Sequence, residues 1–283
     1  MNITPKIREL IKAALNEDCS EGDLTTLGLG IAEIKLKAAV IAKQKGVLSG
    51  LEIFKEVFNI IGDVDFKSAL EDGARFDDGS EIVKIEGNSD VILSAERVAL
   101  NLLSHLSGVA TLTSEFVDVA SRSNIKIYDT RKTTPLIREL EKYAVRAGGG
   151  HNHRANLTQT LMIKDNHINI FRKKYKEEDY ILEMFRMLKE KYPKKELILE
   201  VHNISEWIQA MELDFDVIMF DNWNIEDIEF ALRMVKKRRS QIEISGNITL
   251  EQLENIVGLG IDRISLGRIT HSAPACDFSL EIL

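Results

Sequence analysis

Basic and protonatable side chains gather in one stretch of an otherwise acidic chain. The 283 residues carry a net charge of −8. The stretch between Asp129 and Lys164 nevertheless contains Arg131, Lys132, His151, His153, Arg154 and Lys164. If these groups converge in the fold, an anion must hold them, because clustered cations repel and a desolvated cation costs free energy unless it is paired. A charge-assisted hydrogen bond recovers about 1.5 to 3 kcal/mol. The stretch therefore predicts a site for a dicarboxylate or a phosphate.

Other interpretations apply to some members of this stretch. Arg138 and Lys142 fall midway along a predicted helix, and we interpret both as surface charge. His151 and His153 form an HxH pair, which could indicate a metal site because such sites need imidazole nitrogens in a fixed cluster. The neighbouring Arg154 would oppose a second cation, so we favour the interpretation without a metal.

Two acidic residues and two glycine-containing turns could bind a metal ion, a sugar or a phosphate. Glu200 and Asp221 end two successive predicted strands, which would place two carboxylates near one mouth. Oxygen ligands of this kind suit Mg²⁺ bound jointly with substrate phosphates, although both could instead accept hydrogen bonds from a sugar or balance the basic cluster. Glycine-containing turns follow the last two strands and predict a phosphate seat beside a helix with capping-box spacing. Their residues are Ser245, Gly246 and Asn247, then Leu266, Gly267 and Arg268.

Short apolar strands that alternate with helices would position these groups. The segments are KIYDT, TLMIKDN, LILEVHN, DVIMFDN, QIEISGN and RISLGR. The alternation favours a parallel β/α arrangement, and barrel enzymes build their sites at the strand end where the polar residues of these segments fall. Because six strands are fewer than the eight of a standard barrel, we expect a short or incomplete β/α barrel.

The part of the chain up to about residue 93 has a different pattern. It predicts an α+β domain with a helix near 5–16, a strand at 36–44, a helix at 51–61 and a hairpin-rich stretch at 71–87. Apolar residues then recur at three- and four-residue spacing from Val98 to Val119, which predicts one long amphipathic helix. Ser94 is its expected N-cap. Such a helix would bridge two domains.

Composition and charge exclude several classes of protein. The apolar share of 44% and charged share of 29% favour a packed globular chain over a disordered one. The negative net charge argues against nucleic-acid binding, so we interpret the KKRR run at 236–239 as a helix terminus. No apolar run is long enough for a membrane span and no signal peptide is evident, so we expect a cytoplasmic protein. Cys19 and Cys276 are isolated and are expected to be reduced.

Taken together, these motifs resemble the quinolinate phosphoribosyltransferase family over almost the whole chain. The matching segments, in order, are EDCSEGDLTT, AERVALNLLSHLSGVAT, DTRKTTP, EKYAVRAGGGHNHR, LMIKDNHI, LEV, IMFDN, ISGNI and ISLGRITHSAPACDFSL. Individually most are modest, but their number and order make the match specific. The resemblance implies phosphoribosyl transfer from phosphoribosyl pyrophosphate to quinolinate with decarboxylation, giving nicotinate mononucleotide for NAD synthesis. The implied cofactor is Mg²⁺.

The resemblance also implies an architecture. An α/β sandwich domain at 1–106, joined by the tail 269–283, precedes a β/α barrel at 107–268. A homodimer, or a higher oligomer built from dimers, completes each site with Arg97 of the neighbouring subunit.

Site residues carry over by their motifs. The implied catalytic residues are Lys132, Lys164, Glu200 and Asp221, and the two acids meet the ribose and Mg²⁺. The implied substrate-binding residues are Arg97, Thr130, Arg131, Lys132, His153, Arg154, Lys164, Glu200, Asp221, Ser245, Gly246, Asn247, Gly267 and His271.

This sequence departs from the family pattern at two positions. Leu136 stands where the family usually has glycine after TRKTTP, and His202 follows the strand-end glutamate where acidic residues are common. Both changes bear on loop geometry more than on chemistry. Three rivals stay open: a phosphoribosyltransferase with another acceptor, such as the paralogue encoded beside molybdate transporters; a sugar-phosphate isomerase or lyase; and a noncatalytic binding protein.

Overall fold

The chain forms two compact units, each with its own sheet. The computed structural model describes residues 1–176, 179–235 and 238–283. The first unit comprises Met1–Ser114, Glu139–Gly149 and Ser272–Leu283, and the second comprises Glu115–Arg138 and Gly150–His271. The division expected from sequence, 1–106 with 269–283 against 107–268, differs chiefly because it leaves 139–149 with the barrel. That division stays a prediction.

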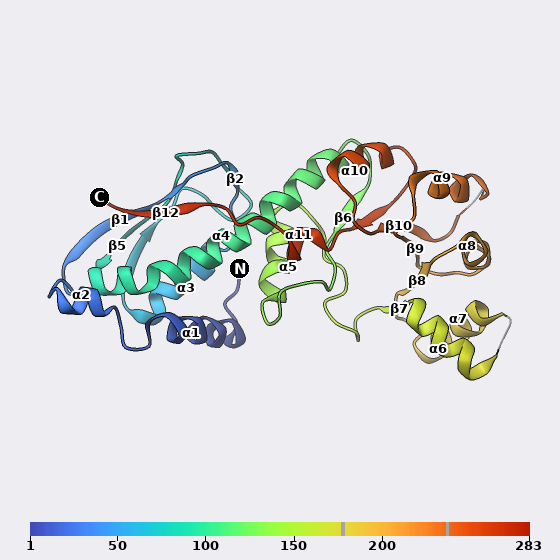
Figure 1. Cartoon of the computed structure of the whole chain (residues 1–283), viewed down its shortest axis with the longest axis horizontal. Helices are drawn as coiled ribbons and strands as arrows, with labels where there is room; N and C mark the ends of the chain where they lie inside the picture. The colour runs from blue at the N-terminus through green and yellow to red at the C-terminus, as the bar shows by residue number, and fades with distance from the viewer. Residues whose placement is uncertain (177–178, 236–237) are drawn as a thin grey trace. The chain divides into compact units, whose positions relative to one another are not determined.

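An antiparallel sheet forms the centre of the first unit. Its strand order is β12-β1-β5-β3, with bounds Phe278–Ile282, Lys35–Ala42, Glu81–Asn88 and Val64–Lys67. The C-terminal strand β12 pairs with β1, so the tail is part of this sheet (Figure 1). A separate two-stranded ribbon joins β2 (Gly46–Val47) to β4 (Arg75–Phe76).

Amphipathic helices supply the rest of this core. Helix α1 (Pro5–Cys19) starts at a proline, and its N-cap Thr4 accepts a hydrogen bond from the amide of Ile7. Helix α2 (Leu24–Gly28) follows, and α3 (Leu51–Ile61) packs against α1. The buried face of α3 consists of Leu51, Ile53, Phe54, Val57 and Phe58. The three-and-four spacing of these residues explains why this segment is a helix.

The long helix α4 runs from Ser89 to Ala120. The predicted helix is confirmed, but the predicted N-cap at Ser94 is wrong, because Ser94 lies inside α4. Val91 and Ile92 are buried and extend the apolar face toward the N-terminus. The hydroxyl of Ser89 donates to the carbonyls of Ile31 and Ala32, and this tertiary contact is not visible in the local sequence.

Helix α5 (Arg138–Ala147) corrects a second expectation. Lys142 is only 5% exposed, so its interpretation as surface charge is wrong. The helix stops at glycines for steric reasons: a Cβ on Gly148 would lie 2.3 Å from the carbonyl oxygen of Ala110, and Gly149 has φ +84°. The glycines thus end the helix and permit close packing on α4.

A parallel six-stranded sheet with order β6-β11-β10-β9-β8-β7 forms the second unit. Following the chain, the strands are Lys126–Tyr128, Leu161–Ile163, Leu197–Val201, Val217–Asp221, Gln241–Ser245 and Arg263–Ser265. All six predicted strands are confirmed. Among the described residues β6 and β7 do not pair, so the expected incomplete barrel is confirmed as well.

Helices connect these strands, as the β/α pattern requires. They are α6 (Asp165–Tyr175), α7 (Tyr180–Lys191), α8 (Ile204–Met211), α9 (Ile225–Arg233), α10 (Leu250–Ile256) and α11 (Arg268–His271). Helix α9 ends before the KKRR run, of which Lys236 and Lys237 lie outside the described residues. Within the described ranges, no helix is both long and apolar enough to cross a membrane.

Parallel register brings the C-terminal strand ends to one edge. Ser245 pairs with both Asp221 and Ser265 across neighbouring strands, and Glu200 pairs with Met219. Beneath this edge, Ile198, Val217 and Met219 form a buried apolar cluster, with Met162 packed against it. The strand-end residues therefore share one rim above a packed interior.

Candidate active site

A cavity of about 300 Å³ opens at this rim, within the second unit. Its volume lies at the lower end of the range for small-molecule sites. Twelve of the residues expected from sequence line it: Thr130, Arg131, Lys132, His153, Arg154, Lys164, Asp221, Ser245, Gly246, Asn247, Gly267 and His271. The remaining lining residues are Met162, Met219 and Ser265. Separate strand ends thus bring the predicted groups around one space.

Positive charge dominates this lining in the described part of the chain. Four lining side chains are cationic, Arg131, Lys132, Arg154 and Lys164, against the carboxylate of Asp221. Arg154 is 8% exposed, and its guanidinium donates to the carbonyl of Thr160 at 3.0 Å. Burial, followed by the nearby charge of Arg131, lowers the pKa of Arg154 from its ordinary value, and Glu200 opposes that shift. A bound anion would relieve the repulsion between these arginines.

Arg138 fixes the loop that carries Arg131 and Lys132. Its guanidinium donates to the hydroxyl of Thr133 at 2.8 Å, to the carbonyl of Ala155 at 3.0 Å and to the carbonyl of Arg131 at 3.3 Å. The interpretation of Arg138 as surface charge is therefore wrong. Arg138 lies at the start of α5, where its planar guanidinium can donate hydrogen bonds to two loops at once.

Leu136, the departure in this same loop, keeps the backbone shape that glycine favours. Its φ is +70°, in the left-handed region, and the side chain is 79% exposed. A leucine in this region carries a steric penalty that glycine would not have.

Asp129 anchors the segment that carries the histidine pair. Its buried carboxylate accepts hydrogen bonds from the side chain of Asn152 at 2.7 Å and from the backbone amide of His153 at 2.8 Å. The sequence analysis assigned Asp129 no role, although its position directly after β6 marks it as a strand-end residue. Because of these bonds His153 is buried, whereas His151 is exposed.

The two predicted carboxylates behave differently. Glu200 is 4% exposed and does not line the cavity; its Oε2 lies 2.5 Å from Lys164 Nζ, and its Oε1 lies 3.4 Å from His202 Nε2. Asp221 lines the cavity and is partly exposed, with Asn222 donating to its Oδ2 at 3.0 Å. Glu200 therefore positions Lys164, while Asp221 is accessible to a ligand.

Two glycine turns, at Gly246 and Gly267, also line the rim cavity. Gly246 has φ +139°, and a Cβ there would lie 2.7 Å from Asn222 Oδ1. A Cβ on Gly267 would lie 2.9 Å from Lys132 Cδ and 3.1 Å from His271 Nε2. The positive φ at Gly246 therefore requires glycine, whereas a side chain at Gly267 would displace Lys132 and His271, and both turns leave backbone close to the cavity. The expected capping box of Thr249 and Gln252 is present at the start of α10.

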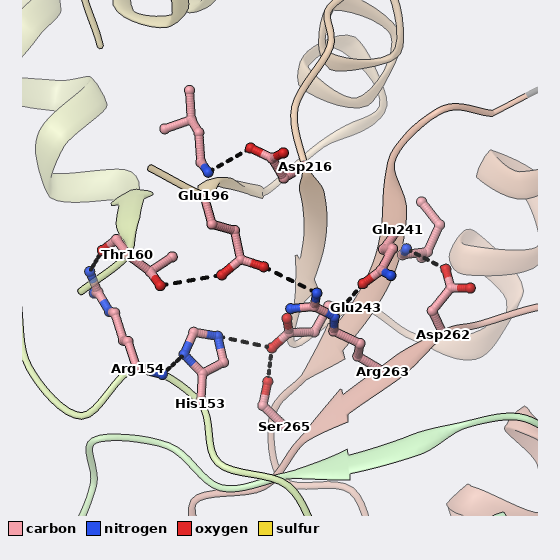
Figure 2. A network of polar contacts seen from close by, with 12 residues as sticks. His153, Arg154, Thr160, Glu196, Asp216, Gln241, Glu243, Asp262, Arg263 and Ser265 are labelled. Carbon is pink, nitrogen blue, oxygen red and sulfur yellow. Dashed lines mark hydrogen bonds and ion pairs between the residues drawn. The ribbon is translucent and has the colours of Figure 1, made fainter. Parts of the chain in front are cut away.

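A buried carboxylate that the sequence analysis did not single out lies inside the barrel. Glu243, in the middle of β10, is fully buried, and Ser265 on β11 donates its hydroxyl to Oε1 (Figure 2). The same oxygen lies 3.6 Å from His153 Nε2. Burial raises the pKa of Glu243 to about 7, and the hydrogen bond from Ser265 opposes that rise. The available signal was a charged residue at the centre of an apolar strand.

Like Glu200, the expected site residue Arg97 falls outside this cavity. Arg97 lies on α4 in the first unit and is exposed. For the HxH pair, no three His, Cys, Asp or Glu side chains within the described residues could hold a metal ion together. His153 instead faces Glu243, and the ring of His151 packs beside Tyr128, with centroids 5.3 Å apart.

A larger cavity of about 520 Å³ lies along α6 and α7 but has different chemistry. Its lining is mostly aliphatic and aromatic, and Arg154 and Met162 also line the rim cavity. Convergent polar groups mark a reaction site more reliably than volume does. We therefore assign the chemistry to the smaller, polar cavity.

Comparisons with known proteins agree with this arrangement. The family profiles of the quinolinate phosphoribosyl transferase N-terminal and C-terminal domains match residues 23–107 and 109–281. A probable nicotinate-nucleotide pyrophosphorylase [carboxylating] of Bacillus subtilis is 38% identical over 98% of this chain and 93% of its own length. A quinolinate phosphoribosyltransferase [decarboxylating] 1b of Nicotiana tabacum is 32% identical over 99% of this chain and 83% of its own length.

Solved structures extend the similarity to the fold. The crystal structure of NadC from Streptococcus pyogenes superposes with a TM-score of 0.89 at 38% identity and covers 99% of each chain. The nicotinate-nucleotide pyrophosphorylase from Francisella tularensis gives a TM-score of 0.89 at 33% identity, covering 99% of this chain and 98% of its own. Because the profiles of both domains match in order and together cover most of the sequence, this chain belongs to the quinolinate phosphoribosyl transferase family.

Proposed function

We propose that this chain transfers the phosphoribosyl group of phosphoribosyl pyrophosphate to quinolinate and releases pyrophosphate and CO₂, forming nicotinate mononucleotide for NAD synthesis. One observation carries the proposal: four cationic side chains, from the loop after β6, the segment before β7 and the end of β7, meet around one cavity that also has a carboxylate and two glycine turns. This charge distribution suits a dicarboxylate on one side and phosphates on the other.

In this proposal the acceptor occupies the basic side. Arg131, Arg154 and Lys164 bind the two ring carboxylates together with Lys132 and His153. Arg154 is already held in place by Thr160, and Lys164 by Glu200, so both are preorganised before the ligand arrives. Thr130 and His271 complete the lining.

The sugar phosphate occupies the other side. The backbone at Ser245, Gly246, Asn247 and Gly267 receives phosphate oxygens, because the two glycines place no side chain of their own over that backbone. Asp221 faces the ribose.

The donor set is compatible with Mg²⁺ at one position. Asp221 offers an accessible carboxylate, the ligand type that Mg²⁺ uses together with substrate phosphates. Glu200 is committed to Lys164, so we do not propose it as a direct ligand in this arrangement. When bound there, Mg²⁺ would neutralise charge on the pyrophosphate.

Electrostatics account for the proposed catalysis. As the bond from the anomeric carbon to pyrophosphate breaks, negative charge grows on the leaving group and positive charge on the sugar. Basic side chains stabilise the former and Asp221 the latter. The pyridine nitrogen then bonds to the anomeric carbon. When CO₂ departs, the resulting positive ring nitrogen stabilises the electron pair left on the ring carbon, and that carbon takes up a proton from water. Lys132 or Lys164 holds the departing carboxylate.

We further propose a homodimer, or a higher oligomer of dimers, in the cytoplasm. Exposed Arg97 on α4 then enters the site of the neighbouring subunit. Its exposure supports this role, since the first unit leaves the guanidinium accessible.

Incubation with quinolinate, phosphoribosyl pyrophosphate and Mg²⁺, followed by mass detection, tests the activity. We expect nicotinate mononucleotide together with equimolar CO₂ and pyrophosphate. A parallel incubation with nicotinate separates the rival acceptor, because that reaction gives the same nucleotide without CO₂. Product from nicotinate alone, or binding of both substrates without turnover, would contradict the proposal.

A further inference from the structure

Below the floor of the rim cavity, one acidic side chain contacts two lining residues without reaching the cavity itself. His153 and Ser265 line the cavity, whereas Glu243 does not. Its Oε1 accepts from the hydroxyl of Ser265 and lies 3.6 Å from His153 Nε2 (Figure 2). Glu243 therefore supports the floor from the interior of the barrel.

The hydrogen bond at the other nitrogen fixes the tautomer of His153. The backbone amide of Arg154 donates to His153 Nδ1 at 2.8 Å, so Nδ1 is the unprotonated acceptor. The ring proton then resides on Nε2, the nitrogen that faces Glu243. The neutral ring is thus hydrogen-bonded to the backbone at Nδ1, and its Nε2–H faces the Glu243 side chain at 3.6 Å.

Packing alone does not explain an acid at this position. Glu243 is fully buried between Ile242 and Ile244 in β10. Its Oε2 is buried and has no hydrogen-bond partner among the residues that the structure describes. A buried carboxylate with incomplete hydrogen bonding costs free energy, and an aliphatic side chain would fill such a strand position without that cost.

We propose that Glu243 is a positioning residue for acceptor binding: its Oε1, which accepts a hydrogen bond from the Ser265 hydroxyl and lies 3.6 Å from His153 Nε2, orients both groups at the floor of the cavity. The inference rests on the proposed function, and it assigns Glu243 to the quinolinate side of the site. Since His153 is adjacent to Arg154 on one buried segment, a rotated imidazole would also displace the amide that precedes the Arg154 guanidinium.

Two substitutions of similar size separate positioning from packing. Glu243→Gln keeps an oxygen acceptor for Ser265 and His153, whereas Glu243→Met fills the same space without one. We expect the KM for quinolinate to rise about tenfold or more in the Met variant and to stay near the wild-type value in the Gln variant. The KM for phosphoribosyl pyrophosphate should change in neither. Ile242→Met is the matched control, because Ile242 is also fully buried in β10 but has no polar contact to lose.

A second readout does not depend on turnover. Nitrogen-15 NMR of labelled histidine, with the His153 signals assigned by their loss in His153→Gln, reports which ring nitrogen carries the proton. The Nε2–H form should dominate in the wild type and in Glu243→Gln and give way to averaged signals in Glu243→Met. A wild type that makes no nicotinate mononucleotide would refute the proposed activity and leave this readout intact. A wild-type tautomer and quinolinate KM in Glu243→Met, or a Gln variant as impaired as the Met variant, would overturn the inference.

Discussion

Charge is handled differently at the rim of the second unit and in its interior. At the rim, Arg131 and Lys132 are partly or well exposed and face a cavity. In the interior, Glu243 is fully buried with one unpartnered oxygen. Rim charges keep much of their hydration until a ligand arrives, whereas the interior charge is desolvated by folding itself. Substitution at the rim should therefore change binding, and substitution in the interior should change stability as well.

The largest expected effect is at the rim. Arg131→Ala or Lys132→Ala should weaken quinolinate binding about 10- to 100-fold, because each removes charge-assisted hydrogen bonds worth about 1.5 to 3 kcal/mol. The melting temperature should stay close to that of the wild type. Calorimetric titration measures both affinities.

Arg122→Ala is the control for this comparison. Arg122 lies in the same unit with a side chain 64% exposed, and its guanidinium forms an ion pair of 3.4 Å with Glu254 at the surface. Its affinity for quinolinate should be unchanged. If the rim variants bind as tightly as Arg122→Ala, the assignment of the basic wall is wrong.

In the interior, the stability contributed by Glu243 should depend on pH. The pKa of Glu243 is raised from 4.5 to about 7 in the folded protein, so the folded state holds this proton more tightly than the unfolded state does. The contribution of Glu243 to the free energy of unfolding should therefore fall by up to a few kcal/mol as pH rises from 4.5 to 7. Above that range it should level off. The groups that face Glu243 are His153, Lys164, Glu196, Arg263 and Ser265.

Glu243→Gln tests whether this loss of stability with rising pH comes from Glu243, because an amide does not titrate. Melting temperatures recorded across this pH range should fall less steeply in the variant than in the wild type, and the variant should be the more stable protein near neutral pH. Identical slopes for the two proteins would mean that Glu243 does not take up a proton in that range.

An intermediate effect is expected at Arg138, which holds the loop that carries Arg131. Arg138→Lys loses the planar fork that reaches Thr133, Ala155 and Arg131, so the loop before α5 should loosen. We expect a loss of about 1 to 3 kcal/mol in the free energy of unfolding and a severalfold higher KM for quinolinate. Denaturant melts and initial rates measure the two changes. Arg233→Lys, at an exposed position on α9, serves as the control. If the two variants have the same stability and the same KM for quinolinate, Arg138 does not hold the loop in place.

The two regions also differ in how far sequence predicts them. All six strands of the second unit were predicted, because each is an apolar run followed by a polar residue, and parallel register then brings those polar residues to one edge. That rule locates the rim. It does not locate Glu243, whose neighbours Ser265 and His153 come from distant parts of the chain.

The errors have the same origin. Arg138 and Lys142 look like surface charges on a helix, but the first bonds to two loops and the second is buried. The ion pair between Glu200 and Lys164 was not visible in the sequence either, although the assignment of Glu200 to the site stays a prediction. The start of α4 was missed because Ser89 is held by carbonyls of residues far back in the sequence. The local sequence pattern predicts the helices, the strands and the sheet edge at which the site lies. The hydrogen-bond and ion-pair partners of each side chain become visible only in the folded structure.

The smallest expected effect is in the rim loop at Leu136. Leu136→Gly should raise the free energy of unfolding by up to about 1 kcal/mol, because relief of the left-handed strain at φ +70° outweighs the extra entropy of glycine in the unfolded chain. Leu157→Gly, at a comparably exposed leucine outside the left-handed region, should instead be destabilising. Denaturant melts of the two variants give the signs, and a loss of stability in both would argue against strain at Leu136.

The central claim is that strand-end cations together bind two carboxylates on one ring. Calorimetric titration of the wild type with quinolinate and, separately, with nicotinate tests it most directly, since the two acceptors differ by one carboxylate. We predict that quinolinate binds at least about tenfold more tightly, in line with the value of one charge-assisted hydrogen bond. Equal affinity for both acids, or binding of neither, would contradict it.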